Sequence, residues 1–232
     1  LADQVKDWAR INGIGTISSV KPKGFWKKCI KEYTPTAIVR PFLATIKLWI
    51  QTREFQPKED RINDHTVIAS LSHPTSFVAP DVYNDVYFGP LVDYLGSLGQ
   101  RALIFAILDG QVRRKPTKLK HAHSPIPIVP VEAYLRLSDI ISCALSAFKR
   151  YIIGFQPDGT ASIAGIDVTN LVQRATREAC HSGNIFEGLR MYRSARRMAQ
   201  RVLVERCIYP YENRTWEKML LHGIREVSRE TR

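Results

Sequence analysis

The sequence predicts an α/β domain in which helices flank a parallel sheet. A short apolar run at Thr66–Leu71 and a second at Arg101–Leu108 have the composition of buried strands. Between them, Asn84–Leu98 has apolar residues at helical spacing and ends at Gly99. Parallel strands need a crossover connection, usually a helix, so this order is typical of a Rossmann-like unit.

The chain before this unit is basic and reads as helical. Three helices are expected there, at Ala2–Ile11, Phe25–Tyr33 and Thr36–Glu54. The polar run Gln56–Arg61 has the composition of a linker. We therefore expect a helical extension and linker over residues 1–64 and a Rossmann-like domain over residues 65–232.

Strands and helices are expected to alternate through the rest of that domain. The remaining strand candidates are Ile126–Val129, Ile163–Val168 and Arg206–Tyr209. The remaining helix candidates are Val131–Ile153, Asn170–His181, Ile185–Val202 and Thr215–Ser228. This alternation favours one sheet with helices on both faces.

Charge and cysteine content narrow the range of partners. The 34 Lys+Arg against 22 Asp+Glu give a formal charge of +12, which favours anionic partners. The four cysteines form no CxxC pair, so we expect reduced thiols in a cytoplasmic protein and no metal site. Nucleic acid is not expected, because no motif of an RNA- or DNA-binding domain is visible.

A first candidate site is the loop that follows the first predicted strand. Ligands of open α/β sheets bind beyond the carboxyl ends of the strands. There, Ser72 and Ser76 can donate to sugar or phosphate oxygens, and His73 can act as an acid or base. The alternative is an ordinary polar connection, and the loop has no GxGxxG fingerprint.

A second candidate is the segment Asn84–Pro90. Asp85 is expected in the first turn of a helix, where a negative charge is favourable for structural reasons. The functional interpretation places Asp85 and Tyr87 at the rim of a cleft beside His73. Both interpretations remain open from the sequence.

A third candidate lies between the last predicted strand and the last helix. Tyr211 and Trp216 can form a platform for a sugar ring, and Glu212 can bind hydroxyls or act as a base. Arg214 can reach an anionic group. Capping explains other residues equally well: Asn213 or Thr215 can cap the helix, and Glu217 can offset its dipole.

Two basic clusters can meet phosphates or simply form solvated surface. The first comprises Arg113, Arg114, Lys115, Lys118 and Lys120 with His121 and His123. The second recurs at three- or four-residue steps along one helix, at Arg190, Arg193, Arg197 and Arg201.

Four segments in this order resemble the N-terminal half of bacterial surface-carbohydrate biosynthesis proteins. They are Ser70–Phe77, Tyr83–Leu91, Gly165–Val172 and Ile208–Lys218, the last being the most specific. Those proteins are similar to GT-B glycosyltransferases, including Kdo-transferase-like enzymes. The resemblance covers about Thr66 to Arg232 and leaves the helical extension unassigned.

The resemblance implies two Rossmann-like domains that face each other, of which this chain supplies the N-terminal, acceptor-binding one. It implies a nucleotide sugar as donor substrate, a glycan or glycolipid acceptor, no cofactor, and a second domain or partner chain. The expected catalytic residues are Glu212, His73 and Asp85, in a cytoplasmic protein at the periphery of the inner membrane. The alternative is a non-catalytic basic module that binds an anionic membrane or a partner subunit.

Overall fold

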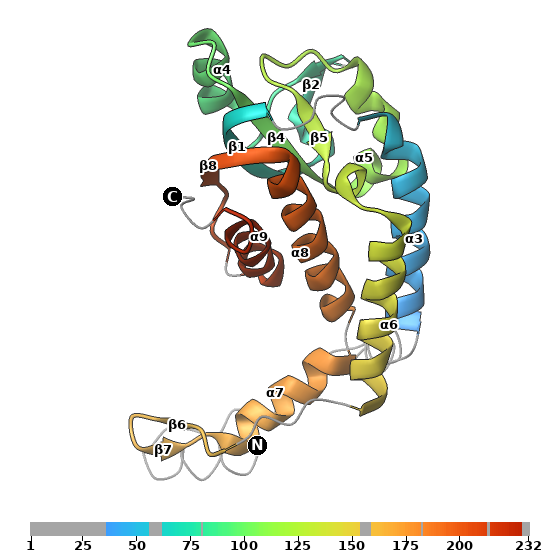
Figure 1. Ribbon diagram of the computed structural model, residues 1–232, viewed down its shortest axis with the longest axis vertical. Helices are drawn as coiled ribbons and strands as arrows, with labels where there is room; N and C mark the ends of the chain where they lie inside the picture. The colour runs from blue at the N-terminus through green and yellow to red at the C-terminus, as the bar shows by residue number, and fades with distance from the viewer. Residues whose placement is uncertain are drawn as a thin grey trace, which may run out of the picture. The chain divides into compact units, whose positions relative to one another are not determined.

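The computed structural model describes residues 36–55, 62–79, 81–153, 159–181, 183–212 and 214–228 (Figure 1). The chain divides into two compact units. The larger comprises Pro41–Ala144 and Phe186–Arg232, and the smaller comprises Leu1–Arg40 and Leu145–Ile185. Among the described helices, none combines the length and apolarity needed to cross a bilayer.

The larger unit is built on a four-stranded parallel sheet with the order β5-β4-β1-β8. Its strands are β1 (Ile62–Ser72), β4 (Ala102–Leu108), β5 (Ile128–Pro130) and β8 (Val202–Ile208). Every pairing within this sheet is parallel, and helices cover it, which confirms the predicted α/β, Rossmann-like class.

The strand order changes direction at β1. From β1 the chain moves to β4 and then β5 on one side, and it later returns to pair β8 with the other side of β1. A sheet wound in both directions from one strand has a topological switch point beside that strand. Here the switch point lies between β1 and β8.

The two faces of the sheet pack against different helices, because side chains alternate along each strand. Val67 and Phe105 lie in one cluster with residues of α8 (Asn184–Arg201) and α9 (Thr215–Arg225). Ile68 and Ile104 lie in the other, with residues of α4 (Gly89–Ser97) and of η3 (Pro116–His121). The sheet is therefore buried on both faces, which explains its nearly continuous apolar strands.

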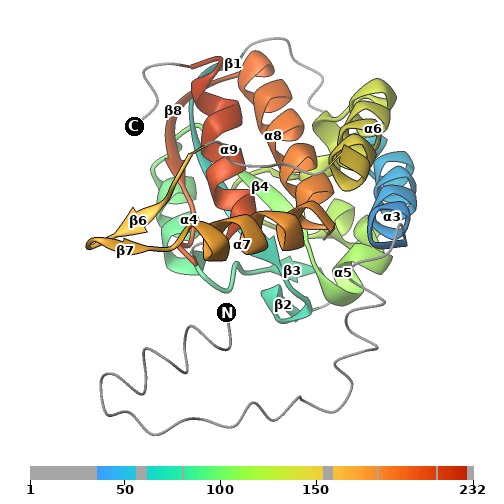
Figure 2. The same cartoon turned by 90° about the horizontal axis from the view of Figure 1, so that it is seen from below.

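Further elements complete this unit. The loop between β1 and α4 holds η2 (Pro74–Ser76) and the pair β2 (Phe77–Ala79) and β3 (Val82–Tyr83). The other elements are α3 (Thr36–Thr52), η1 (Arg53–Phe55), α5 (Gly110–Arg114), η4 (Val131–Tyr134) and α6 (Leu137–Ile153). Within this unit, the segments of α3 and α6 lie side by side in both views (Figures 1 and 2).

Helices α8 and α9 approach each other closely at a glycine. A Cβ at Gly223 would lie 2.5 Å from the backbone oxygen of Tyr192 and 3.0 Å from the Cβ of Ala195. Glycine is required there because any larger residue would push α9 away from α8.

Besides the first residues of α3 and the last residues of α6, which fall within its bounds, the described part of the smaller unit contains a short antiparallel hairpin and a helix. The hairpin pairs β6 (Ser162–Ile163) with β7 (Ile166–Asp167), and Gly165 has a positive φ of 80° in the turn. Helix α7 (Thr169–His181) follows, and the Asp167 carboxylate accepts a hydrogen bond from the Thr169 N–H.

Several boundaries differ from those that the sequence predicts. Strand β1 begins at Ile62, three residues before the expected domain start, and the predicted linker Gln56–Arg61 lies outside the described residues. The expected helix Val131–Ile153 is split into η4 and α6. Strand β8 starts at Val202, where a helix end was expected, because its alternate residues Val202 and Val204 are buried.

The helical extension was also expected to include Ala2–Ile11 and Phe25–Tyr33. These two segments lie outside the described residues. The third, expected over Thr36–Glu54, is α3, which ends at Thr52 and continues as a short 3-10 turn.

Candidate functional site

The loops that carry most of the candidate residues leave the same edge of the sheet. Strands β1 and β8 are parallel neighbours, with Val67 opposite Cys207 and Ile68 opposite Ile208. The loop after β1 and the loop after β8 therefore both start at the carboxyl ends of adjacent strands. From the sequence, the peptides ending near Leu71 and Tyr209 are expected to be neighbouring parallel strands that bring Ser72–Phe77 and Tyr211–Glu217 to a common edge, and the pairing of β1 with β8 confirms this. The same place is the switch point, where open α/β sheets bind ligands.

A buried polar chain starts at the end of β1. The Tyr83 hydroxyl donates to Asp85 Oδ2 over 3.0 Å, and it lies 3.0 Å from the Ser72 hydroxyl. A tyrosine hydroxyl carries one proton, so Ser72 donates to the Tyr83 oxygen. All three side chains are buried, and burial together with the charge of Asp85 raises the pKa of Tyr83 well above its ordinary value.

Asp85 organises the start of α4. Its Oδ1 accepts the backbone N–H groups of Tyr87 at 3.0 Å and Phe88 at 2.9 Å. Helix α4 begins only at Gly89, so the expectation that Asp85 lies in the first turn of a helix is wrong. Its carboxylate instead satisfies donors that precede the helix, and it accepts three hydrogen bonds, from the Tyr83 hydroxyl and from the N–H groups of Tyr87 and Phe88.

The turn before α4 also needs a glycine. A Cβ at Gly89 would lie 2.0 Å from Oδ1 of Asn84, so a side chain there would collide with the turn. Pro90 follows in the first turn of α4, where its missing N–H costs nothing. The irregularity expected at Gly89-Pro90 is thus the start of α4.

One hydrogen bond joins the two loops across the switch point. The Tyr87 hydroxyl donates to Glu212 Oε1 over 3.2 Å, although the two residues are 125 positions apart. Both side chains are exposed. Partial desolvation and the Glu212 carboxylate raise the pKa of Tyr87, so its hydroxyl remains a donor at neutral pH.

Glu212 also pairs within its own loop. Its Oε2 lies 2.9 Å from Nε of Arg214. A carboxylate oxygen can accept two hydrogen bonds, so each Glu212 oxygen keeps one acceptor position for a ligand hydroxyl. The Arg214 side chain is 65% exposed and presents its remaining donors to solvent.

Glu217 holds this loop in place. Its side chain is buried, and Oε1 accepts the backbone N–H groups of Glu212 at 3.0 Å and Arg214 at 3.1 Å. The cap residue of α9 is Arg214, so the expectation that Asn213 or Thr215 caps this helix is wrong. Glu217, at the third helical position, satisfies the cap's N–H, and we assign it a positioning role.

The aromatic residues of the same loop divide into two kinds. Tyr211 is 77% exposed, as a sugar platform requires. Trp216 is half-buried and packs against the cluster under α8 and α9, with its buried Nε1 lacking a partner among the described residues. Trp216 therefore offers less of its surface to a ligand than Tyr211 does. Asn213 lies outside the described residues.

The loop after β1 contains the remaining candidates. His73 is exposed, and its Nδ1 lies 2.9 Å from the Thr75 hydroxyl at the start of η2. Ser76 is fully buried, and its Oγ has no hydrogen-bond partner in the described part of the chain. His73 is the member of this pair that a solvent-borne ligand can reach.

Sequence reasoning missed Tyr83 as a member of the site. It is the central link of the buried chain, and its ring packs edge-on against Phe77 at 5.6 Å. The only local signal is an aromatic residue two positions before an aspartate. That spacing is not diagnostic without knowledge that Ser72 ends the adjoining strand.

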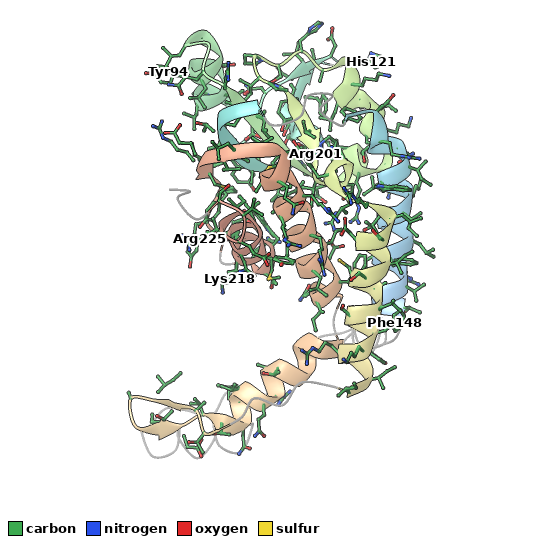
Figure 3. The ribbon with its side chains drawn as sticks, viewed as in Figure 1. Tyr94, His121, Phe148, Arg201, Lys218 and Arg225 are labelled. Carbon is green, nitrogen blue, oxygen red and sulfur yellow. The ribbon has the colours of Figure 1, made fainter. Side chains whose placement is uncertain are left out.

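A basic segment follows β4 at the same edge of the sheet. The backbone N–H of Asp109 donates to the Ser72 carbonyl oxygen over 3.2 Å, which ties the start of α5 to the end of β1. Beyond it, Arg114, Lys115 and Lys118 are exposed and form no ion pair with any described residue. His121 ends η3 (Figure 3).

Two arginines of the predicted cluster on α8, Arg190 and Arg197, form ion pairs within the fold. Arg190 is buried and pairs with Glu132, which is also buried, and with Glu187. Burial opposes the charge of Arg190, yet the two carboxylates raise its pKa. Arg197 makes two hydrogen bonds to Asp139 on α6, at 3.1 and 3.2 Å.

The described residues include no group of three or more His, Cys, Asp or Glu side chains placed to hold a metal ion.

Comparison of the chain with family models, with curated proteins and with solved structures found no match. Fold and geometry thus define a doubly wound α/β protein whose exposed polar residues gather at the switch point of its sheet.

Proposed function

We propose that this chain is the acceptor-binding part of a glycosyltransferase that transfers a sugar from a nucleotide-activated donor to a growing surface glycan or glycolipid. The observation that carries the proposal is the Tyr87–Glu212 hydrogen bond, which joins the two loops at the switch point. Glu212, a carboxylate with free acceptor positions, directly follows Tyr211, which is 77% exposed. Carboxylates and aromatic faces are the groups that bind sugar hydroxyls and sugar rings.

Glu212 is the residue for which we propose contact with the acceptor. In the reaction, the bond between the anomeric carbon and the donor phosphate breaks, and a bond to the acceptor oxygen forms. The acceptor hydroxyl proton then passes to a base, and Glu212 or His73 can take it. Asp85 was an expected catalytic residue, but its burial and its three partners support a role in holding Tyr87 at the rim.

Positive charge supports an anionic substrate. Arg214 lies beside Glu212, and Arg114, Lys115 and Lys118 follow β4 at the same edge. Guanidinium and ammonium groups can offset the charge of a phosphate without a bound metal. In this proposal, the nucleotide-binding site lies in a second domain or in a partner chain.

Glu212→Gln in the full-length protein tests the assignment, with release of UDP from UDP-sugars and of CMP from CMP-sugars as the readout. If Glu212 is the base, kcat falls by about 100-fold or more. If it only binds the acceptor, acceptor KM rises and kcat is unchanged. Unchanged kcat and KM would refute the assignment.

Glu205→Gln is the matched control. Glu205 is an exposed glutamate on β8 that pairs with its neighbour Arg206 at 2.9 Å, outside the loop that follows the strand. This variant is expected to keep the activity of the unmodified protein. If both variants lost the same activity, the loss in Glu212→Gln could not be attributed to a role of Glu212 at the switch point.

A further inference from the structure

Helices α3 and α6 of the larger unit carry exposed apolar residues that no described element covers. On α3, Leu43 is 58% exposed and Ile50 is 60% exposed, seven residues or two turns apart. On α6, Leu137 is 43% exposed and Ile141 is 44% exposed, one turn apart. Each pair therefore lies along one side of its helix.

Hydrogen bonds show which way these sides face. Asp139 binds Arg197, so that side of α6 faces α8. Ile141 lies two residues later, about 200° round the helix axis, and therefore faces away from α8. On α3, the indole N–H of Trp49 donates to the Leu135 carbonyl oxygen over 2.8 Å, so that side of α3 faces the start of α6.

The two apolar sides therefore belong to neighbouring helices of the larger unit. Ile50 follows Trp49 by about 100° and faces outward next to the side that contacts Leu135. Both views place these parts of α3 and α6 next to each other and far from α4 (Figures 1 and 2). We call Leu43, Ile50, Leu137 and Ile141 the α3–α6 surface.

The charges around this surface are mostly basic; the exposed Glu54 that follows α3 is paired with Lys120 at 2.8 Å. The sequence of α3 contains no acidic residue, and that of α6 contains only Asp139, which is buried against Arg197. Lys47, Arg53 and Arg136 are exposed beside the apolar residues. Arg53 also lies over the Trp49 ring, with its Cζ 4.8 Å from the ring centroid.

We propose that the α3–α6 surface docks on an anionic lipid bilayer, with its four apolar side chains in the interface and the basic residues against lipid phosphates. Helices with one apolar side and a basic border lie in the plane of such an interface. A second copy of this chain is a poorer occupant, because it would bring the same basic border and another charge of +12. The proposal does not depend on sugar transfer.

The apolar part is tested by flotation of the full chain with phosphatidylcholine vesicles, with and without phosphatidylglycerol. The chain is expected to bind the anionic vesicles, less so as salt rises. Leu43→Glu with Ile141→Glu should weaken that binding by about tenfold or more, since two apolar groups are replaced by anions. Leu98→Glu, at an equally exposed leucine (52%) after α4, should bind as the unmodified chain does.

The charged part is tested by Lys47→Gln with Arg136→Gln. Each basic residue near an anionic membrane contributes about 1 kcal/mol, so this variant should bind anionic vesicles about tenfold or more weakly and with a smaller salt dependence. Urea unfolding should show that all variants keep the stability of the unmodified chain, because the substituted side chains are exposed.

Three outcomes would overturn the proposal. The first is no binding of the unmodified chain to anionic vesicles at low salt. The second is unchanged binding by Leu43→Glu with Ile141→Glu. The third is a dimer in light scattering that this variant converts to a monomer without any change in vesicle binding, which would assign the surface to contact between copies.

Discussion

The Tyr87 hydroxyl donates to Glu212 Oε1 over 3.2 Å, and this contact ties the segment before α4 to the loop after β8. Neither residue belongs to a strand or helix. Each is instead positioned by a buried carboxylate: Asp85 accepts the Tyr87 N–H, and Glu217 accepts the Glu212 N–H. The buried carboxylates of Asp85 and Glu217 therefore position the backbone of Tyr87 and Glu212, whose side chains form the contact.

A double-mutant cycle measures that exposed contact. Tyr87→Phe and Glu212→Ala should each lower the free energy of unfolding by less than about 1 kcal/mol, since the pair is solvent-accessible. The coupling between the two substitutions should be about 0.5 kcal/mol in urea unfolding. A coupling of zero would show that the hydrogen bond does not form in solution.

Asp85→Ala should destabilise the fold far more than loss of an exposed carboxylate. Removing Asp85 leaves the Tyr83 hydroxyl and two backbone N–H groups without their acceptor, at a cost of about 3 kcal/mol. Asp93→Ala, at an exposed position of α4, should change stability by less than about 0.5 kcal/mol. Similar midpoints for the two variants in urea would contradict the assigned role of Asp85.

The buried pair of Arg190 and Glu132 should show strong non-additivity. Glu132→Gln leaves the buried guanidinium with less compensation and is expected to cost on the order of 3 kcal/mol. Arg190→Met combined with Glu132→Leu removes both charges and should cost less than Glu132→Gln alone. Thermal or urea unfolding of Arg190→Met, of Glu132→Leu and of the double variant gives the coupling, and a loss in the double variant equal to the sum of the two single losses would argue against a buried ion pair.

Alkaline pH should destabilise the protein through Tyr83. Burial, with the charge of Asp85, raises its pKa above the ordinary value of 10.0, so the unfolded chain ionises first. The stability that depends on the neutral hydroxyl is complete below about pH 10 and is lost as pH rises above that value. Tyr83→Phe should be less stable at pH 8 but should lose less stability between pH 9 and pH 11.

A steeper alkaline loss in Tyr83→Phe than in the unmodified chain would contradict this account. Lysines titrate in the same range, but they are common to both proteins and cancel in the comparison.

Two thiols should be unreactive in the folded protein. Burial raises the pKa of Cys143 to about 11 and that of Cys207 to about 12. At pH 8 only about one Cys143 in a thousand is a thiolate, and fewer at Cys207, so alkylation should be slow until urea is added. Peptide mapping after iodoacetamide treatment measures each site, and rapid native labelling at either cysteine would contradict the burial.

The sequence predicted the order of strands and helices well where local patterns are strong. Thr66–Leu71 and Arg101–Leu108 are strands because apolar runs of that length fit a sheet buried on both faces. Boundaries were wrong where a polar contact outweighed the pattern. The Asp85 carboxylate accepts the N–H of Phe88, and α4 begins only at Gly89. The spacing of apolar residues in the sequence does not predict such a contact.

What the sequence alone determined is the α/β class and the position of polar loops after buried strands, since both depend on neighbours a few residues apart. The tertiary structure decided that Tyr83 links Ser72 to Asp85, that Tyr87 meets Glu212, and that Glu217 is buried. Those outcomes depend on contacts between residues far apart in the chain. Such contacts form only when the sheet and its helices pack, so they cannot be predicted from the local sequence.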